Sequence, residues 1–199
     1  NLDDPLYKQR ELVCFIDGEI SQDFNKYINY VTVSMRKKHP GGDITTDEVR
    51  VDRKNFSSEG NSFKLLYGWK PGDNDRRNWL NYEYKTVWNF FGGGSIENDW
   101  KPAADQVIPL KAPVNRRTVN IVADADKVKQ NNIRSVTVRV YYKVGGEEQF
   151  KQTSLNLNKQ VYSATVDFIL SKDQVEYEYE IDWLMGNNQA IKSGRLKSS

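Results

Sequence analysis

Apolar and polar residues alternate along long stretches of the chain with a period of two. The pattern is clearest at residues 31–35, Val-Thr-Val-Ser-Met, and again at residues 136–140, Val-Thr-Val-Arg-Val. Successive side chains of a strand point to opposite faces of its sheet, so this pattern predicts strands with one buried face. Further strands are predicted at about 48–54, 62–69, 80–90, 149–157, 161–170 and 175–184. No segment has the period of a convincing helix.

Three blocks of the sequence occur twice in the same order. Residues 10–17 return at 117–124, residues 28–33 at 133–138, and residues 82–88 at 177–183. The distance between the copies shrinks along the chain, so the first copy carries insertions that the second lacks. A self-similarity of about a hundred residues matches one β-sandwich domain, which predicts a tandem duplication.

The duplication predicts two domains, residues 1–110 and residues 111–199. The segment between them, residues 107–114, reads Val-Ile-Pro-Leu-Lys-Ala-Pro-Val. Two prolines and no glycine make a short and rather stiff connection, so this segment is predicted to be the linker.

One strand of each copy carries the pattern Tyr-x-Tyr-x-x-x-Trp. Its members are Tyr82, Tyr84 and Trp88 in the first copy and Tyr177, Tyr179 and Trp183 in the second. They share one face of a strand, and their recurrence in both copies favours a core role over a ligand-binding role. This strand, followed by a glycine or asparagine turn, resembles the immunoglobulin-like and fibronectin type III-like superfamily. The resemblance implies an all-β fold of two tandem sandwiches and an extracellular location. The cysteine pair of immunoglobulin domains is missing from this sequence.

The opposite face of the second copy's aromatic strand is acidic. It carries Glu176, Glu178, Glu180 and Asp182. Like charges at this spacing repel unless a neighbouring strand compensates them. Arg139 and Lys143 are predicted to do so, which makes a cross-strand charge ladder the main interpretation and a docking surface for a basic partner the alternative.

Charge and composition exclude several classes of protein. Lys and Arg number 29 against 27 Asp and Glu, a net charge of +2, which is not the field of a nucleic-acid-binding protein. No apolar run approaches the roughly 20 residues that cross a bilayer, so membrane insertion is not expected. The first residues, Asn-Leu-Asp-Asp-Pro, have neither a Met start nor a signal-peptide core, which predicts a piece of a longer chain.

Residues for catalysis are scarce. His39 is the single histidine and Cys14 the single cysteine, and they lie far apart along the chain. A catalytic pair would need a nucleophile close to a histidine base, and a zinc site would need several His or Cys ligands. A phosphate-binding loop would need a glycine-rich segment before a helix, and the sequence predicts no helix. Cys14 occupies an apolar strand position and is predicted to be buried. The chain is therefore predicted not to be an enzyme and to need no cofactor.

Calcium is the inorganic ligand that the sequence could accommodate. Asp17 and Glu19 follow the first strand of the first copy, and Asp124 and Asp126 follow the equivalent strand of the second. Acidic side chains two apart at the end of a sandwich can supply oxygen ligands. Asp and Gly also gather at turns without any metal, and turn chemistry is the preferred interpretation.

The largest difference between the copies is an inserted polar loop at residues 70–78. Tryptophans bracket it, and its predicted ligand-binding residues are Trp69, Asp73, Asp75, Arg76, Arg77 and Trp79, together with the more distant Trp100. Aromatic rings among mixed charges stack on sugars or anchor protein partners. The alternative is that the tryptophans fold the loop back onto the sandwich as a lid.

Together these features predict a non-catalytic adhesion, spacer or binding module of a larger, bacterial protein, located extracellularly, at the cell surface or in the periplasm. Its partners would be a protein or polysaccharide and other domains of the parent chain. The alternative is a carbohydrate-binding accessory module of a polysaccharide-degrading enzyme or glycan-binding system, acting through Trp69, Trp79 and Trp100.

Overall fold

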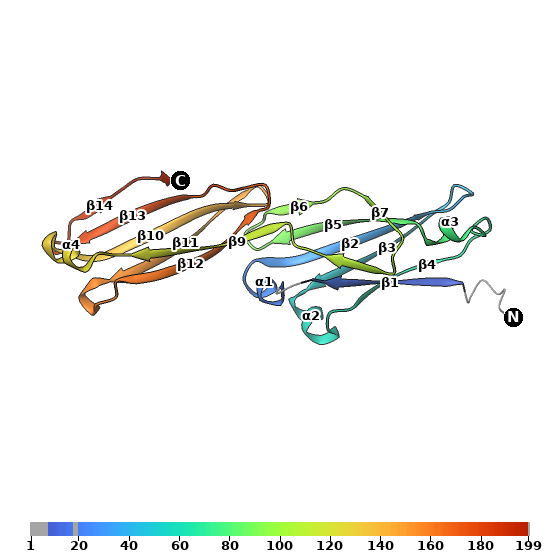
Figure 1. Cartoon of the computed structure of the whole chain (residues 1–199), viewed down its shortest axis with the longest axis horizontal. Coiled ribbons are helices and arrows are strands. Elements are labelled where there is room, and N and C mark those ends of the chain that lie inside the picture. The colour runs from blue at the N-terminus through green and yellow to red at the C-terminus, as the bar shows by residue number, and fades with distance from the viewer. Residues whose placement is uncertain (1–7, 18–19, 199) are drawn as a thin grey trace. The chain divides into compact units, whose positions relative to one another are not determined.

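Strands make up most of the computed structural model, which describes residues 8–17 and 20–198 and is all-β with a few short helices (Figure 1). The chain divides into two units, unit 1 (Asn1–Ala112) and unit 2 (Pro113–Ser199). The division falls inside the proline-containing segment at residues 107–114.

Unit 1 contains two sheets. The larger has the order β3-β2-β5-β6, and β7 pairs with the other end of β5; the smaller has the order β4-β1-β8. The bounds of the larger sheet are β2 (Ile28–Lys38), β3 (Ile44–Asp52), β5 (Tyr82–Phe90), β6 (Ser95–Glu97) and β7 (Lys101–Ala103). Those of the smaller sheet are β1 (Gln9–Ile16), β4 (Phe63–Gly68) and β8 (Val107–Leu110).

The core of unit 1 follows the predicted alternation. Val31, Val33 and Met35 on the central strand β2 are fully buried. Val31 lies opposite Trp88 of β5, whose side chain is also fully buried. Burial of apolar surface at every second residue stabilises the sheet on one face and leaves polar residues on the other.

Strand β8 comes from the segment predicted to be the linker. It runs parallel to β1 and places Ile108 opposite Cys14. Ile108 and Leu110 are each 1% exposed, whereas Pro109 between them is exposed. Residues 107–110 are therefore an edge strand of unit 1 and not a linker, so the linker prediction is wrong for them. Proline is compatible with this strand because an edge strand leaves one side of its backbone without a pairing partner.

Unit 2 repeats the order of the larger sheet as β11-β10-β13-β14, with β15 paired to the other end of β13. These strands are β10 (Ile133–Val144), β11 (Glu147–Asn156), β13 (Glu178–Met185), β14 (Ala190–Lys192) and β15 (Leu196–Lys197). Its second sheet consists of β9 (Val114–Val122) and β12 (Ser163–Ser171). In the described residues of unit 2, no strand occupies the place that β8 has beside β1.

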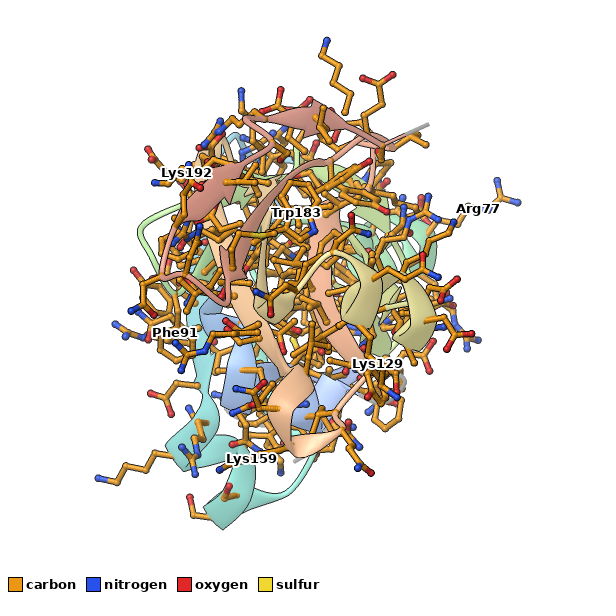
Figure 2. The ribbon with its side chains drawn as sticks, turned by 90° about the vertical axis from the view of Figure 1, so that its left-hand side faces the viewer. Arg77, Phe91, Lys129, Lys159, Trp183 and Lys192 are labelled. Atoms are coloured by element: carbon orange, nitrogen blue, oxygen red, sulfur yellow. The ribbon has the colours of Figure 1, made fainter. Side chains whose placement is uncertain are left out.

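The aromatic strands of the two units differ in burial. Tyr82 and Trp88 on β5 are 3% and 0% exposed, as a core position requires. Every residue of β13, Tyr179 and Trp183 included, is only half-buried; Trp183 is labelled in Figure 2. Tyr84 on β5 is half-buried as well. The predicted core role therefore holds for Tyr82 and Trp88 of unit 1, whereas the aromatic row of unit 2 is only partly covered, where the smaller sheet has two described strands instead of three.

Short helices correct the expectation of a helix-free chain. They are α1 (Ile20–Lys26), α2 (Arg53–Glu59), α3 (Arg76–Leu80), α4 (Ala125–Gln130) and the 3-10 turn η2 (Leu157–Lys159). Asp52, Asp75 and Asp124 cap α2, α3 and α4 by accepting hydrogen bonds from backbone N–H groups of the first turn. None of the described helices is long and apolar enough to cross a membrane.

Candidate functional site

The inserted loop of unit 1 forms a tight turn followed by helix α3. Asp75 caps this helix and accepts a hydrogen bond from the backbone N–H of Arg77 at 3.0 Å. Arg76 and Arg77 are exposed on the first turn, and Figure 2 shows Arg77 extending away from the ribbon. The cap therefore fixes the backbone that carries the two arginines.

Asp73 lies beneath the loop. Its side chain is fully buried and pairs with Nδ1 of His39 at 2.6 Å, while Nε2 of His39 lies 2.8 Å from Oγ1 of Thr45. The same carboxylate oxygen accepts the backbone N–H of Lys70 at 2.9 Å. Predicted as a ligand contact, Asp73 is instead an internal anchor that holds the loop to the end of β2.

The two tryptophans that bracket the loop are half-buried and separately engaged. Trp69 donates its indole N–H to the carbonyl of Asp73 at 3.2 Å, and the ammonium of Lys8 lies 4.7 Å from its ring centre. Trp79 packs edge-on against Tyr67 at 5.1 Å, and the Tyr67 hydroxyl donates to the Trp79 carbonyl at 2.7 Å. These contacts hold the loop against unit 1, but neither ring is buried, so the choice between a lid and a binding loop stays a prediction.

Trp100 belongs to a different cluster. The guanidinium of Arg36 lies 4.2 Å from its ring centre and the ammonium of Lys85 lies 5.4 Å away. No ring contact joins Trp100 to Trp69 or Trp79 among the described residues. The three tryptophans thus have separate partners and do not stack into one platform.

A hollow of about 590 Å³ adjoins α3. Its walls come from the end of β2 and the turn after it, from α3 and its C-cap, from the start of β5, and from β7 with the residue that follows it. The residues that line it are Arg36, Lys37, Lys38, His39, Pro40, Asn78, Asn81, Tyr82, Glu83, Pro102, Ala103 and Ala104. The insertion therefore contributes one residue, Asn78, to the lining of this hollow.

Charges around the hollow are mostly basic. Arg36 and Lys38 both pair with Glu83, at 2.6 and 3.0 Å, and these hydrogen bonds lower the pKa of the Glu83 carboxyl. Lys37 is 1% exposed and donates to the carbonyls of Asn78 and, at 2.7 Å, Asn81; burial lowers the pKa of its ammonium. Lys37 therefore ties α3 to β2.

The acidic face of unit 2 is a cross-strand ladder. β10 lies beside β13, and Arg139 donates to Asp182 at 3.1 Å while the Tyr141 hydroxyl donates to Glu180 at 2.9 Å. Arg195 adds pairs to Glu178 at 3.2 Å and to Glu148 at 2.6 Å. Glu176 and Lys143 line a shallow hollow of about 350 Å³ nearby.

Two of the calcium candidates, Asp17 and Asp124, have other partners. Asp17 lies 3.5 Å from the ammonium of Lys111, and Asp124 accepts the backbone N–H groups of Asp126 and Lys127 as a helix cap. Glu19 lies outside the described residues. Among residues 8–17 and 20–198, no three His, Cys, Asp or Glu side chains gather as a cation site.

Cys14 lies in the core of unit 1. It is fully buried, and this burial, together with the charge of Asp47, raises the pKa of its thiol to about 12. A thiol at such a pKa stays protonated and is a poor nucleophile near neutral pH.

The basic residues at the end of β2 are not among the site residues predicted from the sequence. The signal that could have found them is the alternation itself, which places Lys37 on the same face as the buried Val33 and Met35. A lysine on the core face needs carbonyl partners to be buried, and these come from the insertion.

Comparisons with known proteins assign no family. No protein-family model matches the chain, and no curated protein matches it. A solved structure described as a putative adhesin from Bacteroides ovatus is similar over 98% of this chain and 84% of that chain, with 11% identity and a TM-score of 0.34. A likeness this weak carries no argument about fold or function.

Proposed function

We propose that the chain is a non-catalytic binding module of the adhesion type, part of a larger protein at a cell surface or in a periplasm. The observation that carries the proposal is the insertion of unit 1, which reaches the hollow through Asn78 and presents the exposed Arg76 and Arg77 beside it. A pure spacer would need no such loop. Unit 2 connects the equivalent strands, β12 and β13, without one.

The charge of the site supports an acidic partner. Arg36 and Lys38 line the hollow and Arg76 and Arg77 lie on α3, whereas Glu83 is the single acidic residue among those that line it. Complementary charge steers association and selects the partner. We infer that the partner is a protein that presents an acidic segment.

The single histidine and the single cysteine both have structural contacts, which supports a non-catalytic role. A general base must reach the proton that it removes, yet both ring nitrogens of His39 are held, by Asp73 and by Thr45. Cys14 is buried with a raised pKa. These groups are best explained as structural.

A defined acidic probe tests the proposal. A fluorescently labelled polyglutamate peptide is titrated into the full chain and into the variant Arg76→Ala/Arg77→Ala. The matched control is Lys127→Ala/Lys129→Ala, which removes two exposed charges from helix α4 of unit 2. We expect the arginine variant to weaken binding about fivefold, since each exposed ion pair contributes up to about 1 kcal/mol. If both variants lost affinity for the peptide to the same extent, the loss would reflect the change in net charge alone, and Arg76 and Arg77 would not form the binding site.

Carbohydrate binding is the second candidate, favoured by the half-buried ring of Trp100 next to Arg36 at the hollow. Trp69 and Trp79 have separate contacts, so this candidate rests on one ring instead of three. A polysaccharide array distinguishes the two functions. Saturable glycan binding that is lost in Trp100→Ala and retained in Arg76→Ala/Arg77→Ala would favour the carbohydrate-binding accessory module.

A further inference from the structure

Arg36 lines the hollow of unit 1 and is held there from two sides. Its Nε donates to the carboxylate of Glu83 at 2.6 Å, and its guanidinium lies 4.2 Å from the ring centre of Trp100. Glu83 lies directly opposite Arg36 in the pairing of β2 with β5, so the sheet itself sets the reach of this hydrogen bond. A guanidinium with one bonded nitrogen and one stacked face has lost much of its freedom before any partner arrives.

The far end of this guanidinium is open. Nη1 and Nη2 of Arg36 have no hydrogen-bond partner among residues 8–17 and 20–198, and 28% of the side chain is exposed. Parallel N–H groups on a planar guanidinium match the two oxygens of a carboxylate. Arg36 can therefore donate two hydrogen bonds to a carboxylate while it keeps its bond to Glu83.

The charges beside Arg36 favour a single further carboxylate. The ammonium of Lys38 lies 3.0 Å from Glu83, and its side chain is well exposed. Two cations and one carboxylate leave one positive charge, which one carboxylate of a partner balances. The hydrogen bonds from Arg36 and Lys38 lower the pKa of Glu83, so Glu83 stays charged at neutral pH and continues to hold Arg36.

The remaining lining of the hollow includes apolar residues. Pro40, Pro102, Ala103 and Ala104 contribute to it. A glutamate side chain joins its carboxylate to the backbone through an aliphatic stem, and apolar walls can cover such a stem while the charged end is hydrogen-bonded. The composition of the hollow therefore fits an acidic side chain better than a bare inorganic anion.

Arg50 shows that stacking alone does not make this kind of site. Its guanidinium lies 3.6 Å from the ring centre of Tyr30, and it belongs to β3 of the same sheet. No acidic side chain pairs with Arg50 in the part of the chain that the structure describes, and Arg50 does not line the hollow beside α3. Arg36 is distinguished by its second hold, from Glu83, and by its place at the hollow.

We propose that Arg36 binds a side-chain carboxylate of the acidic partner through both terminal nitrogens of its guanidinium. Trp100 and Glu83 are positioning residues that hold the guanidinium for this contact. The inference rests on the acidic partner proposed above and names the chemical group that the hollow recognises. The Trp100 ring then supports Arg36, whereas in the carbohydrate-binding alternative it would contact a sugar.

The first test compares two lysine substitutions that keep the net charge. Arg36→Lys removes the planar pair of N–H groups from the hollow, and Arg50→Lys is the matched control at a stacked arginine outside it. The probe is the labelled polyglutamate peptide with an amidated C-terminus, so that side chains supply its carboxylates. We expect Arg36→Lys to weaken binding about fivefold and Arg50→Lys to leave it unchanged, because lysine cannot form the two parallel hydrogen bonds.

A double-mutant cycle tests the positioning role of Trp100. Trp100→Leu leaves the net charge unchanged and removes the ring beside the guanidinium. If the ring acts through Arg36, Trp100→Leu should weaken peptide binding about threefold in the unmodified chain and have no effect in an Arg36→Ala background. Equal weakening in both backgrounds would refute the positioning role. Thermal melting of each variant shows that unit 1 stays folded.

The outcomes separate this inference from the function on which it rests. If the peptide binds and depends on Arg76 and Arg77 while Arg36→Lys keeps full affinity, the partner is acidic but Arg36 is not its receptor, and the inference is refuted. Binding that is lost when the C-terminus is amidated would refute the side-chain carboxylate in favour of a chain end. Tighter, Arg36-dependent binding of a galacturonate oligomer would refute the protein partner in favour of an acidic polysaccharide.

A small probe covers the case in which the peptide does not bind. Glutarate is titrated into the full chain, and the Nε–H signal of Arg36, assigned by its loss in Arg36→Lys, is followed by NMR. A saturable shift with a midpoint of about 10 mM would support the carboxylate site and refute only the acidic peptide. No saturable shift at Arg36 would refute the inference itself.

Discussion

Truncation of the two equivalent tryptophans should destabilise the two units to different degrees. Trp88 is fully buried in unit 1, whereas Trp183 in unit 2 is half-buried. Loss of a buried tryptophan costs about 3–5 kcal/mol through lost transfer energy and the remaining cavity. Part of the Trp183 ring already meets solvent, so Trp183→Ala should cost about half as much.

The indole N–H of Trp88 adjusts this magnitude. It is buried and has no hydrogen-bond partner. An unsatisfied buried donor costs about 1–3 kcal/mol, and truncation relieves that cost. We therefore expect a net loss near 3 kcal/mol for Trp88→Ala. Trp88→Phe should lose less, because it keeps an aromatic ring and removes the unsatisfied donor.

Calorimetric melting of the full chain measures both effects, with exchange of amides in β5 and β13 assigning each transition to a unit. A change of 1 kcal/mol moves the melting temperature of a domain of this size by about 4–8 °C, so Trp88→Ala should lower one transition by roughly 15 °C. Equal shifts for the two alanine variants, or a larger one for Trp183→Ala, would refute the assignment of a closed core to unit 1 and an open one to unit 2.

Three further outcomes follow from unit 1. Asp73→Ala leaves His39 without its buried partner and should lower the free energy of unfolding by about 2–4 kcal/mol, with faster amide exchange across residues 69–80; unchanged exchange would contradict the anchor role. The pKa of Glu83 is lowered by its bonds to Arg36 and Lys38, so its stabilising effect is present above the unfolded-state pKa and lost as pH falls through the lower folded-state pKa. Urea midpoints measured down to about pH 3 should therefore fall less in Glu83→Gln. Burial and a raised pKa should make Cys14 unreactive toward thiol reagents at neutral pH until the chain unfolds, and rapid labelling of the folded chain would disprove this.

The strands could be predicted because a sheet with one wet face imposes its period on the sequence. β2 and β10 lie where the alternation places them. The short helices were missed because five to seven residues after a capping aspartate are too few to display a helical period. β8 was missed because Pro109 reads as a loop signal, and only the neighbouring strand shows that the residue lies on an edge.

The candidate site could be located in the sequence, but its internal arrangement could not. The insertion stood out because the second copy lacks it. Asp73 and His39 lie 34 residues apart, and their pairing depends on how the loop folds back onto β2. Asp73 was predicted to contact a ligand because it lies in a polar loop between two tryptophans.

Salt should weaken the contact proposed for unit 1, because that contact depends on exposed charges. Binding of an acidic peptide through Arg76 and Arg77 is an interaction of such charges, and these are screened beyond about 3 Å at 1 M salt. Raising the salt from low concentration to 1 M should therefore abolish binding of the polyglutamate peptide. Binding that persists unchanged at 1 M salt would show that a force other than charge carries it, and the two arginines of α3 would have no part in recognition.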